Sequence, residues 1–348
     1  MEKEILKKEI RFSIHIPRTD YREDMHYIKE QITYKDGSIE PKTYLVKDFK
    51  RPIWVTKEAF RNHNEKKEFE LRDKLLEAKT TESDLNKTIA NLLGKPYLVN
   101  QPNDIKNSPY VYGYDITSTS LIKYISLSKN DFIQSPYKLA TFDIETNPET
   151  DEILIASTVF ENKAHVSILA KYLRGIIDVE HRLKLAMDKY LPQYNNLKID
   201  IKIWDTEVKL IEDIFTVTNE WKPDFLAIWN MNFDIPKILG KLKQYNVNPI
   251  DVICDKTIPR KYRICKYKQG ITKKVTASGV VKPINPSLQW HSLISTTSFY
   301  VIDAMCVYRQ LRMAKAEEPS YALDAILYQN ILQLLQTLIY HQYHFSLI

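Results

Sequence analysis

The stretch that decides the fold is KLATFDIET, residues 138–146. The stretch is largely apolar at first and continues with alternating polar and apolar residues. This pattern predicts a central β-strand that ends on two acidic side chains, Asp143 and Glu145. Residues two apart on a strand point to the same face, so the two carboxylates project together while Ile144 points into the core. Two neighbouring anions repel each other, and a divalent cation between them removes that conflict. Taken alone, the pair also fits two ordinary charges at a sheet edge.

A third acidic residue strengthens the case for a metal site. Asp234 lies in AIWNMNFDIPKIL, residues 227–239, between an apolar strand and a helix that we expect to start at Pro236. An aspartate at this place can also serve only as a helix cap. Three carboxylates from separate elements, however, suit hard cations such as Mg²⁺ or Mn²⁺. The combination therefore predicts a two-metal centre for phosphodiester cleavage.

The segments around these acids predict a mixed sheet with helices on its faces, in an α+β fold. Residues 153–160 and 164–170 follow the central strand as two further strands, which predicts an antiparallel meander. A fourth strand is expected over 225–231. Helices are expected over residues 176–191, 207–224 and 236–247.

The first 137 residues predict a smaller amino-terminal domain, β-rich and partly helical, ahead of a second domain over 138–326. Residues 1–50 alternate strand-like runs with charged turns, whereas the densely charged segment 57–79 is typical of a solvated amphipathic helix. A second helix is expected from residue 84 to a stop at Gly94. Residues 97–137 are rich in Asn, Ser, Tyr and Pro, and we expect a connector there.

The segment 256–302 contains no acidic residue in a chain that has 44 of them. Short β-prone pieces flank Gly270 and Gly279, which predicts a long basic hairpin or ribbon over residues 256–285. A solvated surface hairpin is one explanation, but contact with a polyanion explains the missing acids better. The basic residues of the segment are Lys256, Arg260, Lys261, Arg263, Lys266, Lys268, Lys273, Lys274 and Lys282.

The composition excludes several classes of protein. With 348 residues, 44% of them hydrophobic and 27% charged, the chain is not expected to be disordered, fibrous or a disulfide scaffold. Three scattered cysteines favour reduced thiols in a cytosol. The charged start MEKEILKKEI predicts no signal peptide, and no apolar run of about 18 residues occurs, so we expect no contact with a membrane.

Two motifs resemble those of a known family. ATFDIET resembles the first exonuclease motif of family B DNA polymerases, and AIWNMNFDIPKIL resembles the second, with Asn230, Phe233 and Asp234 at the matching positions. Residues 51–70 and 108–124 are similar to the amino-terminal domain of polymerases from tailed bacteriophages. The similarity continues through SFYVIDAMCVYRQLRMAKAEEPSYALDAIL and covers roughly residues 45–326.

The resemblance implies a ribonuclease H-like fold and 3′→5′ removal of mispaired nucleotides during viral DNA replication, in the cytoplasm of an infected bacterial host. It implies that Asp143, Glu145 and Asp234 bind two Mg²⁺ or Mn²⁺ ions, and that single-stranded or primer-template DNA is the partner. The basic stretch falls where the family carries a β-hairpin that helps to part primer from template. The implied DNA contacts are Asn230, Phe233, Arg260, Lys261, Arg263, Lys266, Lys268, Lys273 and Lys274.

The sequence also departs from the family pattern. The third exonuclease motif, Tyr-x-x-x-Asp, does not occur in the uncharged tail 327–348, and the late acids Asp303 and Asp324 are expected to be structural. We therefore expect a chain truncated before that motif and before the polymerase core, with an impaired exonuclease and no polymerase activity of its own. Two alternatives are a DNA-binding remnant without catalysis and one subunit of a split polymerase, whose core a separate chain supplies.

Overall fold

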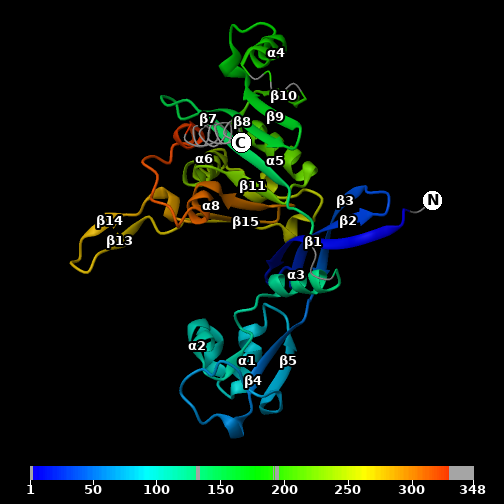
Figure 1. Cartoon of the computed structure of the whole chain (residues 1–348), viewed down its shortest axis with the longest axis vertical. Helices are drawn as coiled ribbons and strands as arrows, with labels where there is room; N and C mark the ends of the chain where they lie inside the picture. Colours follow the sequence, from blue (N-terminus) through cyan, green and yellow to red (C-terminus); the bar gives the residue numbers. More distant parts are fainter. Residues whose placement is uncertain (1–2, 131–133, 191, 193–195, 329–348) are drawn as a thin grey trace, which may run out of the picture.

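The computed structural model of the protein describes residues 3–130, 134–190, 192 and 196–328. It confirms the mixed α/β class and shows three parts stacked along the long axis of the molecule (Figure 1). A six-stranded sheet with helices forms the upper part, a three-stranded sheet the middle part, and a second three-stranded sheet with two helices the lower part. The described residues before 138 therefore form two units.

The six-stranded sheet has the strand order β10-β9-β8-β7-β11-β16. The predicted antiparallel meander is confirmed in β7, β8 and β9, while β11 and β16 run parallel to β7. This arrangement is consistent with the expected ribonuclease H-like fold. The edge strand β10 was missed in the sequence, although its apolar residues alternate with lysine and aspartate as in a half-exposed strand. The strands are β7 (Leu139–Thr146), β8 (Ile153–Phe160), β9 (Lys163–Leu169), β10 (Lys198–Trp204), β11 (Phe225–Ile228) and β16 (Tyr300–Asp303).

Helices complete the core of the upper part, which we call the large domain. Alternate residues of β7 are buried, and Phe142 and Ile144 join one apolar cluster with side chains from α5 and α6. Helix α6 begins at Met231, five residues before the predicted start, so Pro236 lies inside it. The helices are α4 (Val179–Tyr190), α5 (Glu207–Trp221), α6 (Met231–Gln244), α7 (Pro249–Val252) and α8 (Ala304–Leu311).

The middle sheet consists of β1 (Ile5–Ile16), β2 (Met25–Tyr34) and β3 (Ile39–Lys47), all antiparallel. Helix α3 (Ser118–Ser128) packs on β1. Phe12 and Tyr27 of this sheet bury their rings against Ile258 and Tyr262 of the large domain. The middle sheet and the large domain thus share an apolar interface.

The lower unit contains β4 (Arg51–Thr56), β5 (Leu75–Thr80), β6 (Val111–Tyr112), α1 (Leu85–Leu93) and α2 (Pro102–Asn107). Helix α1 ends at Gly94, as predicted, because this residue takes the left-handed conformation with φ 69°.

Two predictions for this region were wrong. Residues 57–79 form no long helix; two short 3₁₀ turns precede β5, which pairs with β4. Dense charge left too few apolar residues for a helical face, and strand pairing decided the conformation instead. The expected connector 97–137 in fact carries α2, β6 and α3.

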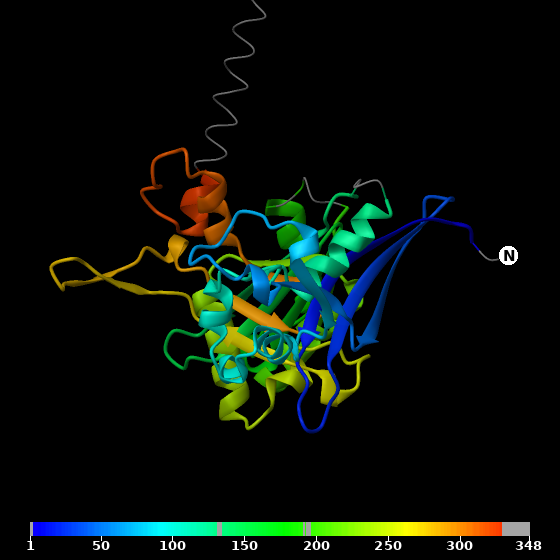
Figure 2. The same ribbon diagram turned by 90° about the horizontal axis from the view of Figure 1, so that it is seen from below.

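The basic stretch forms a ribbon that projects from the body, away from the middle sheet (Figure 2). Its root is β12 (Cys265–Lys268) paired with β15 (Ser292–Ser295), and its outer part is β13 (Lys273–Val275) paired with β14 (Val281–Pro283). The ribbon starts at residue 265, whereas the sequence predicted a start at 256.

No helix in the described part of the chain combines the length and apolar character needed to cross a membrane. The predicted tail, 327–348, lies outside the described residues except for its first two.

A buried ionic cluster joins the middle sheet to the large domain. Asp224, at the entry to β11, accepts hydrogen bonds from Arg11 Nη2 (2.8 Å) and the Lys138 backbone N–H (2.9 Å). The ammonium of Lys29 lies 2.9 Å from its other oxygen. Burial opposes ionisation, but Arg11 and Lys29 outweigh it and lower the pKa of Asp224. The backbone of Asp224 also bonds to Lys138 and Tyr300, so this residue ties β7, β11 and β16 together at one end.

We expect Asp224→Asn to lower the free energy of unfolding by about 3 kcal/mol, because two buried cations lose their anion. Denaturant unfolding followed by circular dichroism measures the change. Glu161→Gln is the control, since it breaks an exposed ion pair with Lys138 and should cost less than about 1 kcal/mol. Equal losses in both variants would contradict this role of Asp224.

We expect Gly270→Ala to cost about 1–3 kcal/mol by overpacking the root of the ribbon. A Cβ at this position would lie 1.5 Å from the backbone oxygen of Gln289, so the two arms of the ribbon would have to separate. Gly240→Ala is the control, because a Cβ there meets nothing within 4 Å and a helical alanine should stabilise α6. Thermal unfolding measures both; an unchanged melting temperature in Gly270→Ala would refute the close approach.

Candidate active site

Two acidic side chains lie along the exposed face of β7. The alternation that buries Phe142 and Ile144 leaves Asp143 and Glu145 on the opposite, solvent-facing side, as the sequence predicted. The parallel pairing of β11 with β7 places Ile228 beside Phe142. The chain therefore leaves β11 next to the acidic end of β7 and turns directly into α6.

Asp234 lies in the first turn of α6 and is only 2% exposed. Its own burial, followed by the charges of Asp143 and Glu145, raises the pKa of Asp234 to about 8. Burial and the charge of Glu145 likewise raise the pKa of Asp143. The structure thus brings the three predicted acids close enough to repel one another.

The Oδ2 atom of Asp234 is buried and has no hydrogen-bond partner. A buried, unpaired carboxylate oxygen is costly unless a cation binds to it, so this atom fits a divalent metal. As placed, no three His, Cys, Asp or Glu side chains within the described residues form a metal-ligand cluster. A divalent metal at this place is therefore supported by the repulsion among Asp143, Glu145 and Asp234 and by the unpaired Oδ2 atom of Asp234.

Asn230 and Phe233 flank this acid on the surface. Asn230 occupies the N-cap position of α6, but its exposed side chain makes no capping hydrogen bond. The ring of Phe233 is 42% exposed, and the ammonium of Lys237 lies 5.3 Å from its centre. An unpaired amide and an exposed aromatic ring beside the acids leave both side chains available to a ligand.

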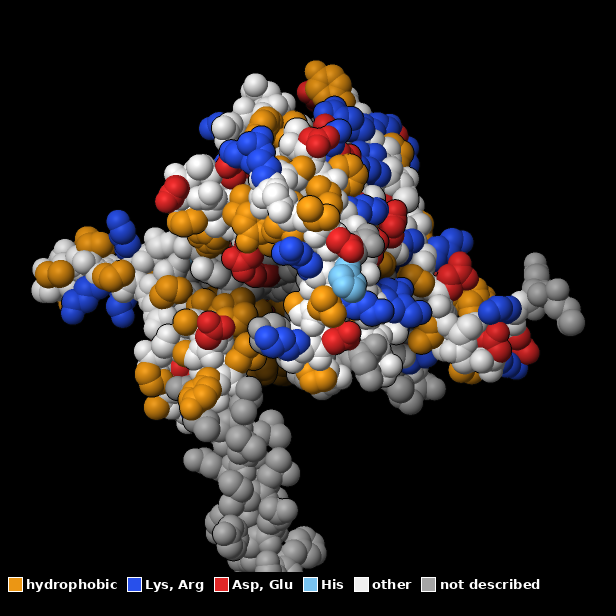
Figure 3. Space-filling model, turned by 90° about the horizontal axis from the view of Figure 1, so that it is seen from above, with side chains coloured by type: hydrophobic (Ala, Val, Ile, Leu, Met, Phe, Trp, Pro, Cys, Tyr) orange, Lys and Arg blue, Asp and Glu red, His pale blue; other side chains and the backbone are white. Residues whose placement is uncertain are grey.

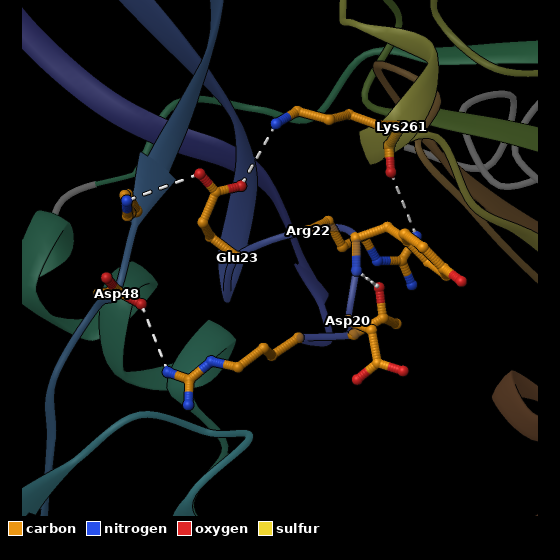
Figure 4. Close-up of a pocket in the computed structure, with 9 residues that line it drawn as sticks. Asp20, Arg22, Glu23, Asp48 and Lys261 are labelled. Carbon is orange, nitrogen blue, oxygen red and sulfur yellow. Dashed lines mark hydrogen bonds and ion pairs between the residues drawn. The ribbon is translucent and has the colours of Figure 1, made fainter.

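The basic residues predicted to bind DNA fall into two groups. Those in segment 256–263 already have partners: Arg260 pairs with Asp251, while Lys261 lies 3.5 Å from Glu23 in the β1–β2 loop. Arg263 donates to the backbone oxygens of Ile258 and Lys256. Figure 4 shows Lys261 of the large domain reaching toward Glu23 in the β1–β2 loop; Arg22 and Asp48 line the same pocket.

The remaining lysines lie on the ribbon, where they are exposed and make no ion pair with any described residue. Lys274 stands directly opposite Lys282 in the ladder of β13 and β14. Like charges in this arrangement destabilise a strand pair unless an anion lies over them. Figure 3 shows the ribbon at one side of the molecule with lysine and hydrophobic side chains both open to solvent. The unpaired lysines are Lys266, Lys268, Lys273, Lys274 and Lys282.

The residues that join the ribbon to the site were not predicted from the sequence. The rings of Tyr267 and His291 are parallel to within 1°, and the Tyr267 hydroxyl lies 2.8 Å from His291 Nδ1. The same hydroxyl and the Gln269 amide approach Asn232 in the first turn of α6, at 3.5 and 3.4 Å. No local pattern marks this contact, because it joins residues more than 30 positions apart.

Asp303 is the N-cap of α8, where its carboxylate accepts from the backbone N–H of Cys306 (3.2 Å). This contact gives it the structural role that the sequence suggested. Asp324 is exposed, close to the end of the described chain.

Comparison with known sequences assigns the chain to a family. A similarity search of curated proteins found no match. A family model described as "DNA polymerase family B, exonuclease domain" matches residues 96–326, which include the sheet, all three acids and the ribbon. The match covers well over half of the chain, so the protein belongs to the family of exonuclease domains found in family B DNA polymerases.

Proposed function

We propose that this protein is a 3′→5′ exonuclease that removes nucleotides from single-stranded DNA ends, and that it belongs to a phage polymerase that replicates viral DNA. The observation that carries the proposal is the unpaired, buried carboxylate of Asp234 beside Asp143 and Glu145, inside a matched exonuclease domain. We further propose residues 138–326 as the exonuclease domain and 1–137 as the amino-terminal domain. The host cytoplasm is the proposed location.

Asp143, Glu145 and Asp234 are the proposed ligands for two Mg²⁺ or Mn²⁺ ions. Such ions lower the pKa of water and offset the charge that develops on a phosphate under attack. The protein's own part is to hold the acids on rigid elements: Asp143 and Glu145 on a strand within the sheet, and Asp234 at a buried helix start. Fixed acids need no rearrangement when the substrate arrives.

The neighbouring residues support binding of a single strand. The exposed ring of Phe233 offers a stacking surface for a base, and base–aromatic stacking is worth about 1–3 kcal/mol for each base. The free amide of Asn230 can donate to a phosphate or sugar oxygen. The unpaired ribbon lysines suit the backbone of primer-template DNA, whereas Arg260, Lys261 and Arg263 are already engaged with the protein.

A second candidate is a DNA-binding protein without turnover. The opposed pair of Lys274 and Lys282 favours this candidate. A bound polyanion would relieve the repulsion between the two lysines, and this effect requires no catalytic site. In that case binding weakens steeply with salt, and added Mg²⁺ or Mn²⁺ produces no cleavage. A separate chain that carries the polymerase core is a further proposed partner.

We expect Asp143→Ala to lower the rate of Mn²⁺-dependent cleavage of a 5′-labelled single-stranded oligonucleotide by about a hundredfold or more, because it removes a proposed metal ligand. Gel electrophoresis resolves the ladder of shortened products. Asp115→Asn, an exposed aspartate on the lower unit, is the control and should cleave at the wild-type rate. Undiminished cleavage by Asp143→Ala would reject the catalytic assignment. An inactive wild type that still binds DNA would favour the second candidate.

Asp234 should make stability depend on pH in the presence of EDTA. Its pKa of about 8 in the folded protein exceeds that of an ordinary aspartate, so the folded state keeps a proton that the unfolded chain has lost. The resulting stabilisation is full below about pH 4 and disappears as the pH rises through 8. We therefore expect Asp234→Asn to melt higher than the wild type at pH 8, by at least about 3 °C, and much less so at pH 5.

Adding Mn²⁺ at pH 8 should reverse that order, because the wild type gains a ligand that the variant binds weakly. Differential scanning calorimetry measures both proteins under these three conditions: pH 5 and pH 8 with EDTA, and pH 8 with Mn²⁺. A difference that is the same at pH 5 and pH 8 would show that Asp234 stays ionised in the folded protein.

A further inference from the structure

One face of the lower sheet is open. Ile53 and Val55 of β4 are buried in the cluster that includes α1, so this helix covers their side of the sheet. Residues alternate between faces along a strand, which directs Pro52 and Trp54 to the other side. The strand register places Lys79 of β5 beside Pro52. This open face therefore combines an indole ring with a basic side chain.

Helix α3 forms the opposite wall. Leu121 and Ile125, one turn apart on α3, line a cleft of about 660 Å³ together with residues of β4 and β5, and Phe49 also lines it. Figure 1 shows α3 lying between the large domain and the lower unit, next to these strands. The volume lies within the usual range for ligand sites, about 300–1,000 Å³.

Positive charge predominates around the cleft. Lys50, Arg72 and Lys79 line it together with a single acid, Glu77. Glu77 lies 3.6 Å from Arg72 and accepts a hydrogen bond from the Trp54 indole at 3.2 Å. Lys50 and Lys79 are exposed and form no ion pair with a described residue. The two lysines are therefore available to an anionic ligand.

The backbone of Gly113 holds the indole ring of Trp54 in place. A Cβ at position 113 would lie 3.1 Å from the ring, so the ring packs directly against the backbone of Gly113. The side chain is nevertheless half-buried and lines the cleft. A ring fixed in this way loses little entropy when a flat ligand stacks on it.

We propose that this cleft binds a segment of single-stranded DNA, with a base stacked on Trp54 and phosphates held by Lys50 and Lys79. An aromatic ring next to unpaired lysines is the pattern with which proteins hold single strands. The proposal rests on the proposed function for the identity of the nucleic acid. It adds a second contact outside the acidic site and the ribbon.

The test measures binding of a fluorescein-labelled twelve-residue oligo(dT) by anisotropy, with the full chain carrying Asp143→Ala and with EDTA present. We expect the double variant Lys50→Glu/Lys79→Glu to weaken binding about tenfold or more at low salt. The matched control is Lys87→Glu/Lys95→Glu, which makes the same change of charge on the α1 side of the same unit. That control should weaken binding by no more than about threefold.

A second readout separates stacking from charge. Trp54→Leu should weaken binding at least about fivefold while the slope of log Kd against log salt stays unchanged, since stacking releases no counterions. The lysine double variant should instead flatten that slope by up to about 2. Circular dichroism confirms that each variant is folded.

Three results would overturn the proposal: equal losses in the two double variants, full affinity in Trp54→Leu, or equally tight binding of an oligo(U) or of duplex DNA. Because these measurements need no cleavage, an inactive wild type would refute the proposed exonuclease and leave this binding result intact.

Discussion

The rest of the structure depends on the ion pairs and hydrogen bonds that the buried residue Asp224 makes. Its side chain receives Arg11 and Lys29 from the middle sheet, and its backbone bonds to Lys138 and Tyr300 in the large domain. These contacts set where β7, β11 and β16 start relative to one another. Since a strand's register determines which residues meet at its far end, they also determine that Asp143 faces the first turn of α6.

The contact between the middle sheet and the large domain also explains which basic residues of the segment 256–302 have acidic partners. Tyr27 of β2 donates to Asp255, and Tyr262 donates to Glu23 at 2.6 Å, so residues 255–263 are bound between the middle sheet and the large domain. Lysines and arginines in that part neutralise nearby acids. Beyond residue 265 the chain leaves the body, and its lysines make no ion pair with the residues that the structure describes. One acid-free stretch thus has a paired part and an unpaired part.

The sequence predicted well wherever a local pattern carried the information. The alternation of KLATFDIET, the apolar strands that follow and the stop of α1 at Gly94 all depend on residues close in the chain. It failed where pairing with distant residues decided the outcome, as in β5, which takes its conformation from β4. The ion pairs of Arg260 and Lys261 with acids on other elements could not be predicted either. Counting acids within residues 256–302 could not reveal partners that lie outside that window.

Two buried aspartates only ten residues apart show how structural and functional acids differ. Asp224 and Asp234 are 3% and 2% exposed, yet the first accepts hydrogen bonds from cationic and backbone donors while the second keeps an oxygen without a partner. Burial opposes ionisation of both, but Arg11 and Lys29 outweigh it and lower the pKa of Asp224, whereas the charges of Asp143 and Glu145 add to it and raise the pKa of Asp234. Burying an unpaired carboxylate costs several kcal/mol, and the apolar side chains of α6 that pack in the core with β7 and α5 hold the helix in place against that cost. This unpaired oxygen is why we propose Asp234, and not Asp224, as a ligand for a divalent cation.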